Sequence, residues 1–175
     1  MKLVSYLNEG HDRLGLLVDG LVYSMNLIHP DLPDTMGMML NYWDDSISMI
    51  QGGEIMIGDG RINNEKGIPV NELDLLSPIP FPTSCRDAYA FRQHVAAARR
   101  NRKVDMIPEY DEYPIFYFTN HHSVQGPGPV LCMPDHFHKL DFELEAAIVI
   151  CRHGRNIAAA EAYPPGSSQE QLYSV

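Results

Sequence analysis

The stretch Arg13-Leu14-Gly15-Leu16-Leu17-Val18-Asp19-Gly20-Leu21-Val22-Tyr23-Ser24-Met25 decides the fold of the first part of the chain. It places an Asp-Gly pair between two apolar runs, and both turn residues tolerate a positive φ, which predicts a β-hairpin. An earlier apolar run, Leu3 to Leu7, ends in Asn8-Glu9-Gly10 and predicts a first strand with its turn. Residues 1–76 are therefore expected to form a small β-rich domain.

Three further signals follow the hairpin. Apolar residues recur at three- and four-residue steps from Thr35 to Ile50 and predict a helix that Gly52-Gly53 ends. Proline at every second position of the segment 77–82 predicts an extended crossing between two domains. Ser84, with Asp87 three residues on, resembles a capping box and predicts that a second helix begins there.

Composition sets the class of protein. The 175 residues are 45% hydrophobic and 21% charged, and the formal net charge is −10 at pH 7. No apolar run approaches the roughly 18–20 residues that cross a bilayer, and the N-terminus has no signal-peptide core. A chain of this charge repels phosphate backbones and anionic membranes, so we expect neither a nucleic acid nor a membrane as partner. The basic run from 99 to 103 is expected to be a solvated helix end.

The cysteines indicate the compartment. Cys85, Cys132 and Cys151 are far apart and odd in number, which argues against a disulfide framework or a structural zinc site. We expect free, mostly buried thiols in a cytoplasmic protein.

The most informative stretch for chemistry is a strand predicted from about Lys139 to Cys151, after another strand predicted at 113–124. Side chains alternate faces along a strand, so Asp141, Glu143 and Glu145 share one face. Neighbouring carboxylates repel, and a divalent cation with a preference for hard oxygen ligands removes that penalty. The alternative is an ordinary solvent-facing strand, which the strand pattern by itself favours.

The helix predicted after Ser84 adds a second element. Asp87 and His94 are seven residues apart, two helical turns, so they lie on nearly one face, about 10 Å apart along the axis. If that face borders the acidic strand, Asp87 completes a cation site and His94 acts as general base on a water. The alternative for His94 is a surface histidine or one satisfied in the interior.

Two separated motifs carry a family resemblance. Arg86-Asp87-Ala88-Tyr89-Ala90-Phe91-Arg92-Gln93-His94, followed by Leu140-Asp141-Phe142-Glu143-Leu144-Glu145, resembles the fumarylacetoacetate hydrolase family. The resemblance covers residues 73–162 and implies an α+β fold: a small N-terminal β-rich domain at 1–76, then the start of a mixed-β catalytic domain at 77–162. A disordered tail is expected at 163–175. Members are metal-dependent enzymes acting on 1,3-dicarbonyl or 2-oxo acid substrates; many hydrolyse a carbon–carbon bond, and relatives decarboxylate, isomerise or dehydrate.

The resemblance also implies roles for single residues. Asp87, Glu143 and Glu145 match carboxylate ligands of a divalent cation, with Mg²⁺ preferred and Mn²⁺ or Ca²⁺ as alternatives. His94 matches the histidine that activates water, and Tyr89 and Tyr117 match positions that contact substrate. Smaller-substrate members often carry a lysine near Thr119-Asn120; this chain has Asn120, which leaves the substrate class open. Members are usually dimeric, so a homodimer is the expected assembly.

One departure from the family pattern bears on activity. The family's fourth metal ligand is an aspartate in an Asn-Asp-Trp-Ser-Ala-Arg type segment soon after the region matching 158–162, and this chain runs instead into Tyr163-Pro164-Pro165-Gly166. We expect a frameshift or a truncated reading frame, with much of the catalytic domain missing. Two alternatives follow: an inactive fragment without turnover, and a cupin-like metal protein using His136 and His138 with Glu143, although the glycines that flank a cupin motif do not fit.

Overall fold

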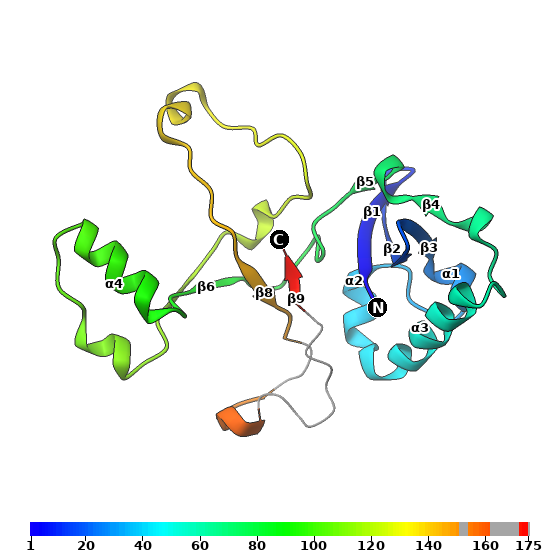
Figure 1. The fold of residues 1–175 in the computed structure, drawn as a ribbon, viewed down its shortest axis with the longest axis horizontal. Helices are drawn as coiled ribbons and strands as arrows, with labels where there is room; N and C mark the ends of the chain where they lie inside the picture. Colours follow the sequence, from blue (N-terminus) through cyan, green and yellow to red (C-terminus); the bar gives the residue numbers. More distant parts are fainter. Residues whose placement is uncertain (151–153, 162–171, 175) are drawn as a thin grey trace. The chain divides into compact units, whose positions relative to one another are not determined.

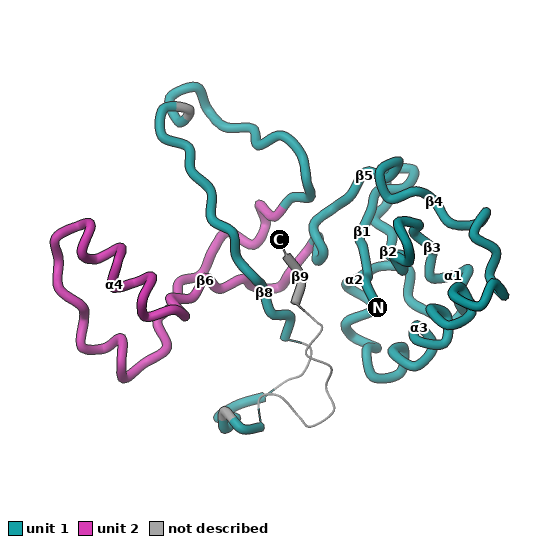
Figure 2. Tube along the Cα trace, in the orientation of Figure 1, with its two compact units in different colours: residues 1–80, 125–175 teal, residues 81–124 magenta. Residues whose placement is uncertain are grey.

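The computed structural model describes residues 1–150, 154–161 and 172–174 (Figure 1). The chain divides into two compact units, one containing residues 1–80 and 125–175 and the other residues 81–124 (Figure 2). The two units are described separately below.

The first unit is built on a five-stranded antiparallel sheet with the order β4-β3-β2-β1-β5. Its turns follow the local sequence: Asp19 and Gly20 have φ angles of 49° and 82°, the two positive values that a two-residue hairpin loop requires. Glu9 and Gly10, at 51° and 79°, turn the chain after the first strand in the same way. The predicted hairpin and first strand are thereby confirmed. The strands are β1 (Leu3–Asn8), β2 (His11–Val18), β3 (Leu21–Ser24), β4 (Ile68–Pro69) and β5 (Asp74–Leu75).

The unit also contains three helices: α1 (Met25–Ile28), α2 (Met36–Asn41), which contacts α3, and α3 (Trp43–Gly58). Both α1 and α3 contact β2, and Figure 1 shows them beside the sheet. The core between the layers is apolar, and its most enclosed side chains are Leu14, Leu16, Tyr23, Met25, Met39 and Ile50. Burial of these side chains is the main source of stability for the unit.

The helix predicted from Thr35 to Ile50 differs from the observed helices at both points where sequence signals were used. The helix is interrupted at Tyr42, whose φ and ψ of −120° and 29° separate α2 from α3. It also continues past Gly52-Gly53 to Gly58. Gly53 is there for packing, since a Cβ at this position would lie 2.2 Å from Cγ2 of Ile28. A glycine that permits close approach was therefore mistaken for a helix stop.

The later part of the first unit contains less regular structure than predicted. The strand expected from 139 to 151 is reduced to β8 (Ala146–Ile148), which pairs antiparallel with β9 (Leu172–Ser174). Since a strand needs a neighbour for its backbone hydrogen bonds, a three-residue partner limits the pairing to three residues. Within the predicted tail the structure describes only β9. Residues 163–171 and 175 lie outside the described residues, as does Cys151, so the disordered tail stays a prediction. Ala159–Glu161 form a short 3-10 helix.

The second unit contains an antiparallel pair and one helix. β6 (Arg86–Ala88) pairs with β7 (Phe116–Phe118), and α4 (Arg92–Asn101) lies between them in sequence. The helix predicted to begin at Ser84 is wrong in its start, because 86–88 are extended and paired with β7. The capping box is absent as well: the N-cap of α4 is Phe91, without a side-chain cap hydrogen bond. The strand predicted at 113–124 is likewise reduced to β7.

Within the described residues, no helix combines the length and the apolar character needed to cross a membrane. Cys85 is exposed, contrary to the expectation of buried thiols, and Cys132 is half-buried; both are free. The domain limits at residues 76 and 162 stay predictions.

Candidate metal centre

Asp87 is positioned by the β6–β7 pair. It is half-buried on β6, directly opposite Tyr117 on β7. The Tyr117 hydroxyl donates a hydrogen bond to Oδ2 of Asp87 at 2.5 Å. This length is typical of a hydroxyl donor to a charged carboxylate. The antiparallel register therefore determines both where the carboxylate lies and which group holds it.

A cation–aromatic cluster lies on the opposite face of the same strand pair. The guanidinium of Arg86 lies 5.6 Å from the ring centroid of Phe116 and 4.8 Å from that of Phe118. The two rings meet edge to face, with centroids 5.6 Å apart. Because side chains alternate along a strand, Arg86 and Asp87 belong to opposite faces. The cluster thus occupies one face of the pair and leaves the other to Asp87 and Tyr117.

Glu143 and Glu145 come from the segment that leads into β8. Both side chains are exposed, and the intervening Leu144 is 86% exposed. The neighbouring Asp141 is used locally, since its Oδ1 accepts a hydrogen bond from the backbone N–H of Phe142 at 2.9 Å. The segment 140–145 is not assigned to a strand, so the predicted strand face does not exist as such.

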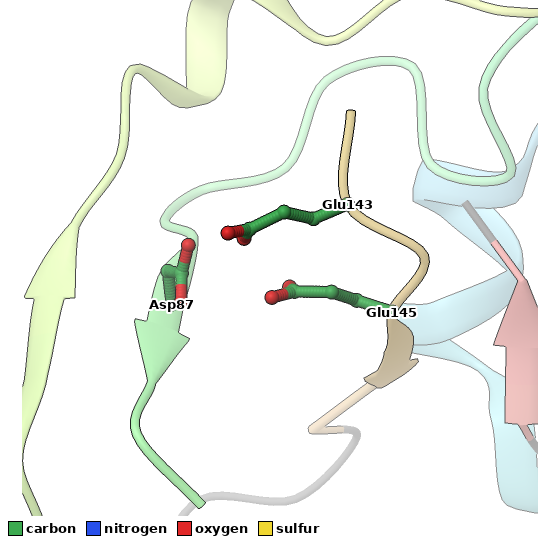
Figure 3. Close-up of side chains that lie close together, drawn as sticks. All are labelled: Asp87, Glu143 and Glu145. Carbon is green, nitrogen blue, oxygen red and sulfur yellow. The ribbon is translucent and has the colours of Figure 1, made fainter. Parts of the chain in front are cut away.

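Asp87 belongs to the second unit, and Glu143 and Glu145 belong to the first. Figure 3 draws the side chains of these three residues. Each offers a carboxylate oxygen as a ligand atom, and an all-oxygen donor set is the kind that hard divalent cations prefer.

His94 and Tyr89 lie on either side of the start of α4. His94 is in the first turn of α4 and is exposed. Among the described residues it does not belong to the candidate ligand set of Asp87, Glu143 and Glu145. Since Asp87 is on β6 and His94 on α4, the prediction that they share one helix face is wrong. Tyr89 is held by its backbone: its N–H donates to the carbonyl of Ile115 at 3.0 Å, and its carbonyl accepts from the hydroxyl of Tyr110 at 2.9 Å.

An ion pair between Arg92 and Asp111 connects the start of α4 to the segment that precedes β7. Both Nε and Nη2 of Arg92 donate to the carboxylate of Asp111, each at 2.9 Å. The hydrogen bond from Arg92 lowers the pKa of the Asp111 carboxyl, and the same bond raises the pKa of the guanidinium. Sequence reasoning missed this pair and the Tyr117–Asp87 bond, because both depend on partners 19 and 30 residues away.

The histidines of the cupin alternative lie elsewhere in the chain. His136 and His138 belong to a 3-10 helix, Pro134–Lys139, and neither is in the candidate ligand set of the described residues. His121 and His122 form part of a 3-10 turn, with ring centroids 4.3 Å apart.

Comparison with known protein families finds a match in the second half of the chain. Residues 83–164 match the family model described as fumarylacetoacetate (FAA) hydrolase C-terminal. The family is generally enzymatic and often metal-dependent. The resemblance carried by the two sequence motifs is thereby confirmed.

A curated relative extends the similarity into the N-terminal half. The chain is 22% identical over 170 residues to the "Fumarylacetoacetate hydrolase domain-containing protein 2 homolog" of Dictyostelium discoideum. The match covers 93% of this chain and 50% of the relative, so the chain spans about half the length of that protein.

Proposed function

We propose that this chain carries the divalent-cation site of a hydrolase that cleaves a carbon–carbon bond in a 1,3-dicarbonyl or 2-oxo acid substrate. The proposal rests on the three carboxylates of Asp87, Glu143 and Glu145, and on the Tyr117 hydroxyl, which holds the Asp87 carboxylate by a hydrogen bond. The match of residues 83–164 to the FAA hydrolase C-terminal family model supports the reaction class.

The ligand set determines the preferred ion. Three carboxylates place several negative charges close together, and a hard cation offsets their mutual repulsion. Mg²⁺ is the first choice, with Mn²⁺ and Ca²⁺ as alternatives, because all three prefer oxygen ligands. When bound, such a cation supplies Lewis-acid polarisation of the substrate oxygens.

The remaining roles fall to side chains of β6, α4 and β7. His94 is the proposed general base, whose imidazole nitrogen takes a proton from the attacking water. The water oxygen forms a bond to the substrate carbonyl carbon, the carbon–carbon bond breaks, and the departing carbon takes up a proton. Tyr89 and Tyr117 are proposed to contact the substrate, since each carries a phenol able to donate to or accept from an oxo group.

The test is hydrolysis of an acylpyruvate by the purified 175-residue chain, measured with and without a chelator. The proposal predicts turnover that a chelator abolishes and that added Mg²⁺ restores. Turnover that is insensitive to the chelator would contradict the metal mechanism. Tight cation binding without any turnover would favour a second function, that of a cation-binding protein without hydrolase activity.

The cupin alternative predicts histidine ligands, so substitution of those histidines distinguishes it from the proposed function. Substitution of both His136 and His138 by alanine should leave Mn²⁺ affinity unchanged if the carboxylates hold the ion, and should abolish binding if a cupin-like site does.

A further inference from the structure

We infer that Tyr117 is a positioning residue for Asp87, acting on cation binding through the carboxylate it holds. The inference rests on the proposed function, because it assumes that Asp87 is a ligand. It assigns Tyr117 a role beyond the substrate contact proposed above.

The first support is the backbone register. Asp87 and Tyr117 are direct cross-strand partners, so their Cβ atoms are close and their side chains share one face of the pair. On the other face, Arg86 lies over the rings of Phe116 and Phe118.

The second support is the hydrogen bond itself. The Tyr117 hydroxyl donates to Oδ2 of Asp87 at 2.5 Å, the short end of the range for a hydroxyl bound to a charged oxygen. A carboxylate has two oxygens and about four lone-pair sites, so the bond to Oδ2 leaves acceptor capacity for a cation. The bond also restricts rotation of the carboxylate, so less conformational freedom is lost when an ion binds.

The phenol chemistry makes the two roles of Tyr117 compatible. A tyrosine hydroxyl has one donor hydrogen, which Asp87 occupies, and its oxygen can still accept a hydrogen bond from another group. A substrate contact alone would change KM and leave cation affinity in the absence of substrate unchanged. A positioning role predicts a change in cation affinity before any substrate is present.

The experiment is a calorimetric titration of the full chain with Mn²⁺ alone, comparing Tyr117→Phe with the unsubstituted protein. Loss of a hydrogen-bond partner to a ligand typically weakens metal affinity 10–100-fold, and we expect a loss of about tenfold here. Tyr113→Phe is the matched control, since it removes a phenolic hydroxyl from the same unit at a side chain that is 63% exposed. Equal Mn²⁺ affinity of Tyr117→Phe and the unsubstituted protein would overturn the inference while leaving the proposed cation site intact.

A double substitution separates positioning from a general loss of structure. If Tyr117 acts through Asp87, Tyr117→Phe has no further effect on Mn²⁺ affinity in an Asp87→Ala background. A tenfold loss in that background as well would show that the hydroxyl acts by another route and would overturn the inference. Absence of Mn²⁺ binding by the unsubstituted chain contradicts the proposed function itself, which distinguishes its failure from that of the positioning role.

Discussion

Asp87 and Tyr117 are separated by 30 residues in the chain and joined by a 2.5 Å hydrogen bond across an antiparallel strand pair. The pairing places a carboxylate and its donor on one face, with the Arg86 cluster on the other. A carboxylate held in this way is ready to bind an ion without first being ordered. The local β-structure of the second unit therefore bears directly on the chemistry proposed for it.

The first prediction concerns the proposed base. His94→Asn removes the proposed proton acceptor. His94 is not one of the three proposed ligands, so Mn²⁺ affinity should stay unchanged. Turnover of an acylpyruvate should fall by about 10²–10⁴-fold, the contribution typical of a general base. The measurement pairs steady-state kinetics with a Mn²⁺ titration of the same sample. Unchanged turnover would remove His94 from the mechanism.

A second prediction concerns the pH dependence of the Arg92–Asp111 pair. Arg92 lowers the pKa of Asp111 below its ordinary 3.8, so the pair stabilises the folded state above that pH, and the stabilisation is lost as pH falls through the lowered value. Both side chains are more than half exposed, so the effect is small and screened by salt. Thermal unfolding of Asp111→Asn should show a lower midpoint than the unsubstituted protein near pH 6, with the difference vanishing in strong acid. A difference that persists or grows in acid would contradict the assignment.

The third prediction uses two adjacent glycines of α3. Gly53→Ala should destabilise the protein by about 1–3 kcal/mol, because the new methyl group would overlap Ile28 in a packed core. Gly52→Ala is the matched control: a Cβ there meets no atom within 4 Å, and alanine should stabilise the helix by about 0.5–1 kcal/mol. Urea unfolding of both variants checks the opposite signs. Similar behaviour of the two variants would contradict the packing described for Gly53.

The sequence permitted the local features of the fold to be predicted, and the failures share a cause. Asp19-Gly20 specifies its hairpin through the φ angles of two adjacent residues, so no distant partner is needed. The helix start at Ser84 was wrong because 86–88 pair with a strand 30 residues later, and non-local pairing overrides a local capping signal. Gly53 was misread as a stop because its contact with Ile28 exists only in the folded protein.

The candidate site shows the same division. The residue types of Asp87, Glu143 and Glu145 indicated oxygen ligation, and their assignment as ligands stays a prediction. The route to that expectation was partly wrong, since Asp87 is on a strand and residues 140–145 are not assigned to one. Tyr117 was expected only as a substrate contact, and its bond to Asp87 could not be anticipated without the β6–β7 register.

The central claim, that three carboxylates hold one hard divalent ion, is tested most directly by calorimetric titration with Mn²⁺ of Glu143→Gln beside Asp141→Asn. Both substitutions remove one negative charge from the same short segment, but only Glu143 is a proposed ligand. The account predicts one ion per chain, an affinity at least tenfold weaker in Glu143→Gln, and an affinity close to that of the unsubstituted protein in Asp141→Asn. Equal losses in the two variants, or no binding by the unsubstituted chain, would contradict it.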